Sequence, residues 1–178
     1  MRANTSRRQA NGSSWNINLQ SGQYFNPTFS GFDPSNTGTN GGRPDRVGDG
    51  NLPAGQREIT HWFDQTAFAI PGCPSTKPVC TAAERSNVGR FGNTALNILE
   101  GPGIANLDMA LGKNFAVREK SELQLRFNMV NAFNHPNYGV PRANISSAGT
   151  VGTINAIARV LNGEPATREI NIGLRLQF

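Results

Sequence analysis

The sequence predicts an all-β protein, a fragment of an antiparallel transmembrane β-barrel with about four strands and two long loops. Three observations predict this class. The last stretch, residues 168–178, alternates apolar and polar residues. The chain has 20 Gly and 11 Pro but only 37% hydrophobic residues, which suits short strands and long loops better than helices. Long and short connections also alternate along the chain, as they do in transmembrane barrels.

The final strand gives the clearest signal. Its apolar residues occupy every second position up to the terminal aromatic: Ile170, Ile172, Leu174, Leu176 and Phe178. Transmembrane barrel strands are about 9–11 residues long, alternate in this way and carry aromatic residues at the membrane interfaces. A soluble antiparallel sheet with one solvated face gives the same alternation, so this strand alone leaves both interpretations open.

Three further stretches show the same period of two. They cover residues 15–25, 104–115 and 121–133, and the first alternates Trp15, Ile17 and Leu19 with polar residues. Lys113 falls on the apolar face of the second stretch near its end, where a long side chain can reach the membrane interface. The predicted opposite faces carry the charged residues Asp108, Glu122, Arg126, Glu169 and Arg175, which we expect to be solvated.

The predicted loops cover residues 26–103 and 134–167. Residues 30–53 are so rich in Gly, Pro, Asn and Asp that we expect turns there and no apolar face. The apolar stretches 61–63 and 67–70 are expected to pack the first loop on itself. If the C-terminus faces the periplasm, both long loops lie outside and the short turn lies inside, as in outer-membrane barrels.

Cys73 and Cys80 bracket the polar segment CPSTKPVC and predict a local disulfide in an oxidising compartment. The alternative is a pair of free thiols. A metal site is less favoured, because His61 is the only nearby imidazole and four-ligand spacing is missing. The run 45–51 resembles a calcium loop faintly but lacks the distal Glu, which favours a polar turn.

Composition argues against several function classes. The net charge of +5 comes from scattered arginines, without the basic stripe and stacking aromatics of a nucleic-acid-binding protein. The apolar runs are too short for a membrane helix, and the first residues show no secretory signal. The sequence contains no G-x-S-x-G, H-E-x-x-H or C-x-x-C motif, so we expect neither an enzyme nor a cofactor.

Three segments resemble one family. FGNTALNILEGPGIANLDMALGKNF, LQLRFNMVNAFNHPNYGVP and EINIGLRLQF are similar to the C-terminal end of TonB-dependent outer-membrane receptors, in particular the Oar-like, acidobacterial type. The NAFNHPNYG piece and the terminal Phe178 are the most specific parts. The resemblance implies a 22-stranded barrel with an N-terminal plug that takes up scarce ligands with energy passed through TonB. It also implies that Ile172, Leu174, Leu176 and Phe178 form the signal read by the barrel-assembly machinery.

The chain departs from that family pattern, since it shows no plug, no TonB box and too few strands to close a barrel. We therefore expect the C-terminal portion of a larger receptor in the cell outer membrane, as a truncated product or a sequence fragment. Its expected partners are outer-membrane lipid, the assembly machinery, an unknown extracellular ligand, and TonB only through the missing N-terminal part. The alternative is a secreted or surface β-domain that binds glycans or protein through its Gly/Asn-rich loops. In that case the apolar faces would pack against each other instead of against lipid.

Overall fold

The computed structural model describes residues 11–74, 76–118, 121–158 and 167–178. The chain divides into two compact units. The sheet unit comprises Met1–Gln20, Ile104–Asn137 and Ala158–Phe178, and the loop unit comprises Ser21–Gly103 and Tyr138–Ile157. In the described part of the chain, no helix is long and apolar enough to cross a membrane.

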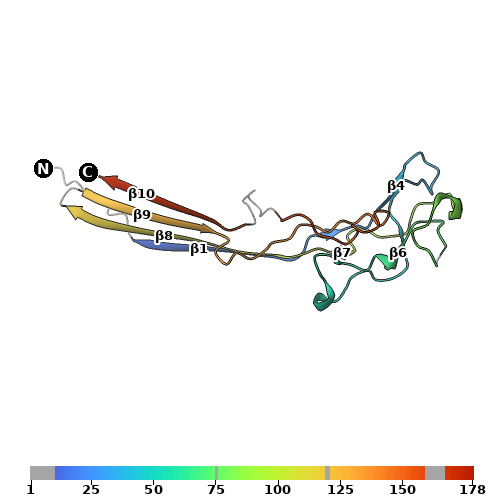
Figure 1. Cartoon of the computed structure of the whole chain (residues 1–178), viewed down its shortest axis with the longest axis horizontal. Coiled ribbons are helices and arrows are strands. Elements are labelled where there is room, and N and C mark those ends of the chain that lie inside the picture. Colours follow the sequence, from blue (N-terminus) through green and yellow to red (C-terminus); the bar gives the residue numbers. More distant parts are fainter. Residues whose placement is uncertain (1–10, 75, 119–120, 159–166) are drawn as a thin grey trace. The chain divides into compact units, whose positions relative to one another are not determined.

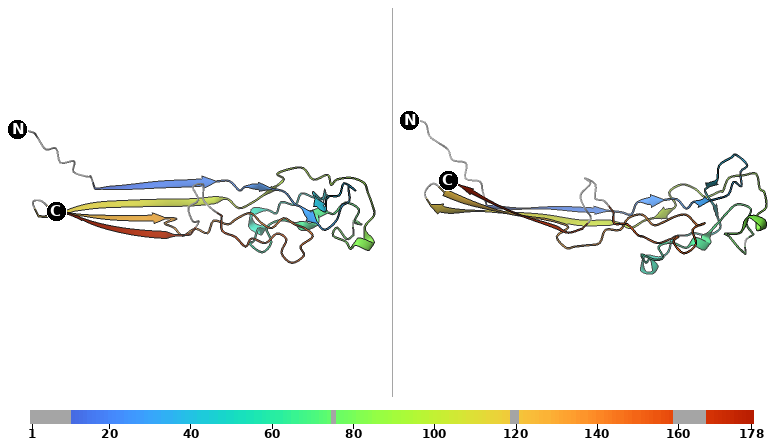
Figure 2. Two further views of the ribbon diagram at one scale, coloured as in Figure 1. Left: turned by 90° about the horizontal axis from the view of Figure 1, so that it is seen from above. Right: turned by 45° about the horizontal axis from the view of Figure 1, so that its top comes forward.

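The sheet unit contains a four-stranded antiparallel sheet in the order β1-β8-β9-β10 (Figure 1). Its strands are β1 (Gly12–Gln20), β8 (Ile104–Arg118), β9 (Ser121–Val130) and β10 (Glu169–Gln177). Figure 2 shows these strands running side by side, viewed from two further directions. Because neighbouring strands are antiparallel, the short β8–β9 connection lies at one end of the sheet and the long connections leave from the other.

The strands of this sheet are staggered. β1 pairs with Ile104–Gly112 of β8, whereas β9 pairs with the stretch of β8 from Met109 to Arg118. The paired region therefore moves along the strand direction from β10 toward β1. Closing a sheet into a barrel requires such a stagger, because barrel strands are tilted relative to the barrel axis.

The strand limits differ from those predicted from the sequence. The first strand ends at Gln20, and Tyr24 and Phe25 belong to a separate short strand. β8 runs beyond the predicted end at Phe115, with a register shift near its end. β9 ends at Val130 and not at Phe133, because Asn131 adopts a left-handed conformation with φ of 49°.

The described residues of the loop unit form three short two-stranded pairs and three 3-10 turns. β2 (Tyr24–Phe25) pairs with β7 (Leu99–Glu100), β3 (Phe29–Ser30) with β4 (Gly41–Gly42), and β5 (Asp45–Arg46) with β6 (Phe68–Ala69). The 3-10 turns are η1 (Ala54–Gln56), η2 (Gln65–Ala67) and η3 (Ala82–Glu84). The sequence also leaves a brief β segment possible at residues 150–160; residues 159 and 160 lie outside the described residues, and the described part contributes an isolated bridge between Ile157 and Tyr138.

The loop unit has its own hydrophobic core. Phe63 lies at its centre and makes edge-to-face contacts with Phe25 and Phe68 at centroid distances of 5.8 and 6.1 Å. Leu99 and Ile70 are also almost fully buried. The prediction that the apolar stretches 61–63 and 67–70 pack the loop on itself is confirmed.

The expectation that residues 30–53 form turns without an apolar face is correct for most of them, but Pro44 is fully buried and Gly50 lies against the core. Gly50 has a φ of +82°, and a Cβ there would approach the Phe68 ring to 2.5 Å. Glycine is therefore required both by the positive φ of the backbone and by the lack of space for a Cβ.

Asp45 accepts two hydrogen bonds from the Arg90 guanidinium, at 2.7 and 2.8 Å, which hold the pKa of that carboxyl below its usual value.

Candidate functional site

The register of the sheet gathers its large apolar side chains on one face. Directly paired residues of antiparallel strands point to the same side. Trp15 lies opposite Met109, Met109 opposite Met129, and Met129 opposite Ile170, so these four residues form one row across all strands. We call the whole set the apolar face: Trp15, Ile17, Leu19, Leu107, Met109, Leu111, Phe115, Leu123, Leu125, Phe127, Met129, Ile170, Ile172, Leu174 and Leu176.

The apolar face is not covered by the described residues. Trp15 is 71% exposed and Leu174 is 70% exposed, values typical of a side chain with almost nothing packed on it. Each residue of the buried core lies in the loop unit. The sheet therefore does not pack its apolar side chains against a second layer within the described residues, as a soluble β-sandwich would.

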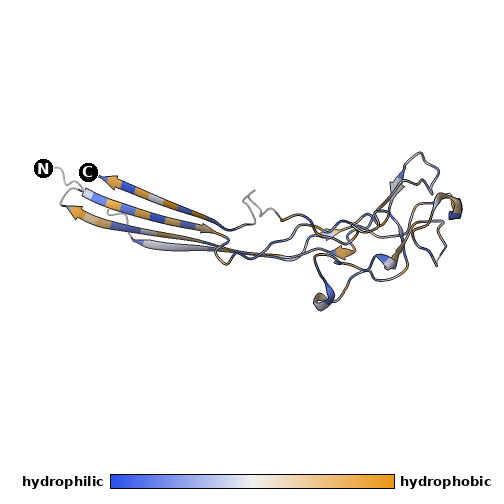
Figure 3. Cartoon of the chain, in the orientation of Figure 1, coloured by the Kyte–Doolittle hydropathy of each residue, from blue (hydrophilic) through white to orange (hydrophobic). Residues whose placement is uncertain are grey.

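Residues on the opposite side of the sheet are mainly polar, and we call this side the polar face. Figure 3 shows the resulting alternation of hydropathy along β9 and β10. Arg126 lies opposite Gly173 and Gly112, and Glu122 lies opposite Gln177 and Ala116. The five charged residues predicted on this side, including Asp108 and Arg175, are placed there by the register.

A polar turn closes the end of β9. The Asp108 carboxylate accepts hydrogen bonds from Asn106 Nδ2 at 2.8 Å and from the Asn131 backbone N–H at 3.0 Å. The Asn131 side chain in turn bonds both the N–H and the carbonyl of His135, at 3.0 and 2.8 Å. Asn137 Oδ1 accepts from the Ala105 N–H at 2.8 Å, which ties the turn back to the start of β8.

The NAFNHPNYG segment, singled out in the sequence for its family resemblance, also has a structural role. Asn131 and Asn137 are almost fully buried, at 1% and 0% exposure. The signal that could have revealed this is the spacing of asparagines around a Pro. Asparagine tolerates left-handed backbone and its side chain bonds nearby backbone groups.

A protein-family model described as an outer membrane beta barrel domain matches residues 12–170. The chain belongs to this outer membrane beta barrel domain family. The match begins at the first residue of β1, includes the whole loop unit and reaches the second residue of β10. No curated protein and no solved structure matches the chain.

Membership of the barrel family accounts for the two faces of the sheet. The wall of a transmembrane barrel has one apolar side and one polar side because adjacent residues of each strand face lipid and lumen alternately. The predicted all-β class, with open antiparallel strands of a barrel fragment, agrees with both the family and the structure. The family also indicates an outer-membrane location.

The residues predicted as an assembly signal lie on β10 and directly after it. Ile172, Leu174 and Leu176 belong to β10 and are 69%, 70% and 56% exposed on the apolar face. Phe178 follows the end of β10 and is 95% exposed. Among the described residues, β10 pairs with β9 alone, so its other edge presents free backbone groups.

In the loops of the barrel domain, Cys73 and Cys80 form a disulfide. Lys77 lies inside the ring that the disulfide closes, and its Nζ donates to both Glu84 carboxylate oxygens at 2.9 Å. Glu84 also accepts from the N–H and hydroxyl of Thr81, which completes a capping box. These bonds, led by the one from Lys77, lower the pKa of Glu84 to about 2.

The ring of the disulfide also forms one wall of a cavity in the loop unit. The volume of this cavity is about 400 Å³. The walls are formed by Pro78 and Val79 from the ring, Gln65 and Thr66 from η2, and the segment around Ile145. Small-molecule pockets of about 300–1,000 Å³ commonly combine apolar walls with a few polar groups.

Within the described ranges, no three His, Cys, Asp or Glu side chains gather in a way that could hold a metal ion. The run 45–51, compared above with a calcium loop, contains side-chain contacts between its own residues in addition to the ion pair of Asp45 with Arg90. Arg46 donates to the Asp49 carboxylate at 2.7 Å and to the Gly48 carbonyl at 2.8 Å. This geometry is that of a polar turn.

Proposed function

We propose that this chain forms the C-terminal wall of a TonB-dependent, Oar-like transporter of the outer membrane. One observation carries the proposal: a staggered antiparallel sheet has an uncovered apolar face on one side and a polar face on the other. The apolar face contacts lipid, and the polar face lines the lumen. The NAFNHPNYG segment and terminal Phe178 support the TonB-dependent type through the resemblance given above.

The dimensions of the apolar face suit a membrane. At about 3.3 Å of rise per residue and about 40° of tilt, the stretch Ala105–Phe115 spans about 25 Å along the barrel axis, which equals the apolar band of such barrels. Both long connections leave from the Gln20 end of the sheet and the short one from the Arg118 end. Long loops of outer-membrane barrels face outward, so the Arg118 end faces the periplasm.

The proposed partners follow from this orientation. Phe178, with Ile172, Leu174 and Leu176, is the contact for the barrel-assembly machinery, and β10 offers it an edge that no described residue pairs. TonB acts through the N-terminal part that precedes the barrel in this family type. The extracellular ligand meets the loop unit, and the cavity beside the disulfide is the place in that unit where we expect contact.

The test uses the native product in its own cells. Antibodies against this chain are expected to detect a protein in the outer-membrane fraction that resists carbonate extraction, and site-directed photo-crosslinking is expected to join it to TonB. An outer-membrane protein without a TonB crosslink would refute TonB-dependent transport but would agree with an outer-membrane barrel. A protein released by carbonate would refute both, and would favour the surface β-domain with a binding loop unit.

A further inference from the structure

We propose that Lys113 and Phe115 form a binding site for the phosphate of an anionic phospholipid, at the periplasmic boundary of the apolar face. The proposal rests on the proposed function, because it requires this face to contact lipid. Lys113 lies opposite Leu125, which lies opposite Leu174, so the register places its charge on the apolar face. Along Ala105–Phe115 and the residues paired with it, Lys113 is the one charged residue that the register places on the apolar face.

The position of Lys113 near the end of β8 lets its charge reach the lipid headgroups. It lies two positions from Phe115 on β8, which places it about 5 Å inside the periplasmic limit of the apolar band. A lysine at the midplane of a barrel's lipid face costs about 2–4 kcal/mol, and this cost falls to about 0–1 kcal/mol near the interface. A side chain as long as lysine reaches the headgroup level from this depth.

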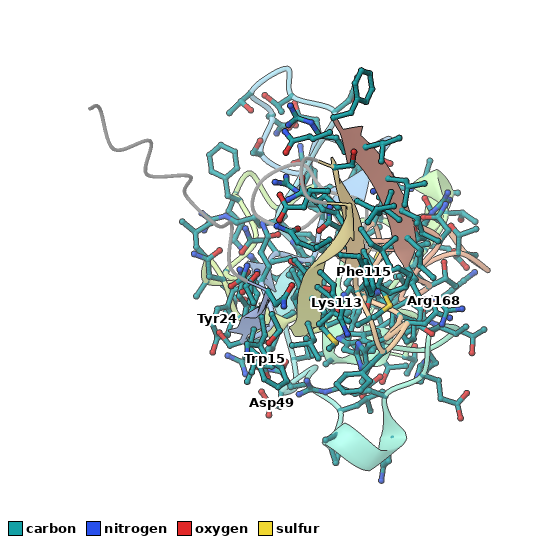
Figure 4. The ribbon with its side chains drawn as sticks, turned by 90° about the vertical axis from the view of Figure 1, so that its left-hand side faces the viewer. Trp15, Tyr24, Asp49, Lys113, Phe115 and Arg168 are labelled. Carbon is teal, nitrogen blue, oxygen red and sulfur yellow. A yellow bond between two sulfur atoms is a disulfide. The ribbon has the colours of Figure 1, made fainter. Side chains whose placement is uncertain are left out.

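Phe115, whose ring lies near the ammonium group, is two positions nearer the Arg118 end of β8. Lys113 Nζ lies 5.2 Å from the centroid of this ring, and Figure 4 shows the two residues next to each other. The ring attracts the cation and has no acceptor that would neutralise it. Within the described residues Lys113 forms no ion pair with a carboxylate. A phospholipid phosphate supplies the missing anion, and its acyl chains cover the neighbouring apolar residues.

The experiment compares two charge-removing variants of the 178-residue chain, Lys113→Gln and Arg175→Gln. Arg175 lies opposite Gln124, which lies opposite Asn114, so it is at almost the same height but on the polar face. Binding is measured to two kinds of vesicle, one of 30% phosphatidylglycerol in phosphatidylcholine and one of pure phosphatidylcholine. The measured quantity is the binding constant for the first divided by the binding constant for the second. We expect Lys113→Gln to lower this ratio about fivefold, the contribution of one lysine near an anionic membrane. Arg175→Gln is expected to change it by less than twofold, and Lys113→Arg to retain it.

A separate signal keeps the failure of this proposal distinct from failure of the lipid-facing assignment. Trp15 lies on the apolar face, and in the Trp62→Phe background it is the remaining tryptophan. Brominated acyl chains are expected to quench its fluorescence. The phosphate site is refuted if Trp15 is quenched but Lys113→Gln and Arg175→Gln lower the binding ratio for phosphatidylglycerol vesicles equally, or do not lower it. If Trp15 is not quenched, the lipid-facing assignment fails, and the phosphate site fails with it.

Discussion

The strongest test of the lipid-facing assignment is an arginine placed at the centre of the apolar face. Leu111 lies on β8, in a row with Phe127 and Ile172, and is 43% exposed. It lies about 10 Å from the periplasmic limit of the apolar band and about 15 Å from the outer limit. The adjacent Ala110 belongs to the polar face, opposite Ser14 and Asn128, and provides a matched site for the same substitution.

The expected cost of Leu111→Arg follows from this depth. An arginine near the midplane of a barrel's lipid face raises the folding free energy by about 3 kcal/mol. This cost lowers the equilibrium constant for folding into the bilayer on the order of a hundredfold. Ala110→Arg is expected to cost less than about 1 kcal/mol, because the new charge faces a polar surface that includes Asp108.

The assay is reversible urea unfolding of the chain from phosphatidylcholine vesicles. Tryptophan fluorescence detects unfolding, and both variants are fitted with the same m-value, the dependence of the unfolding free energy on urea concentration. If the apolar face were solvated, an arginine at a position as exposed as Leu111 would cost less than about 0.5 kcal/mol. Equal midpoints for Leu111→Arg and Ala110→Arg would therefore refute the assignment of the two faces.

Three further predictions concern the connections. Replacing Cys73 and Cys80 by Ser is expected to destabilise the loop unit by about 2–3 kcal/mol, measured by hydrogen exchange; unchanged protection in that unit would contradict a stabilising role. The Lys77–Glu84 contact is expected to be complete above pH about 4.5 and lost as pH falls through about 2, because folding lowers the pKa of Glu84 from 4.5. The chemical shift of the Glu84 carboxyl carbon, measured by NMR, reports the protonation of this group. In the control variant Lys77→Gln, the pH at which Glu84 is half protonated should be higher. Asn131→Gly is expected to lower the free energy of unfolding by about 2 kcal/mol, because the side-chain hydrogen bonds to His135 are lost. Asn131→Ala is expected to lower it by about 1 kcal/mol more, because alanine disfavours the positive φ of this residue. Urea unfolding measures both values, and equal values would exclude the backbone contribution.

The sequence was sufficient to predict the strands of the sheet and the direction of their faces. A period of two is a local property, so Ile170–Leu176 and Leu123–Met129 could be assigned to one side without knowing their partners. The register then had to follow, because a slip by one residue would place Leu125 against the polar side of β10. Strand ends were less predictable, since they depend on the conformation of single residues such as Asn131.

The organisation of the loop unit could not be predicted in the same way. Its core joins residues far apart in the chain, such as Phe25, Phe63 and Leu99, and none of its strands is longer than two residues. Such contacts leave no periodic pattern. The ion pair of Asp45 with Arg90 is equally non-local. The local signals were the apolar stretches at 61–63 and 67–70, the two cysteines and the turn-rich composition of residues 30–53.

The distribution of buried residues is itself an argument about the environment of the sheet. The loop unit buries phenylalanines in a core of its own, as a water-exposed segment must if it is to stay folded. The sheet instead leaves Trp15, Leu19, Ile172 and Leu174 more than two-thirds exposed. A chain that can bury Phe63 and Phe68 so completely has no physical reason to leave these residues in water. The contrast is removed if the two units lie in different solvents, with water around the loop unit and hydrocarbon against the apolar face.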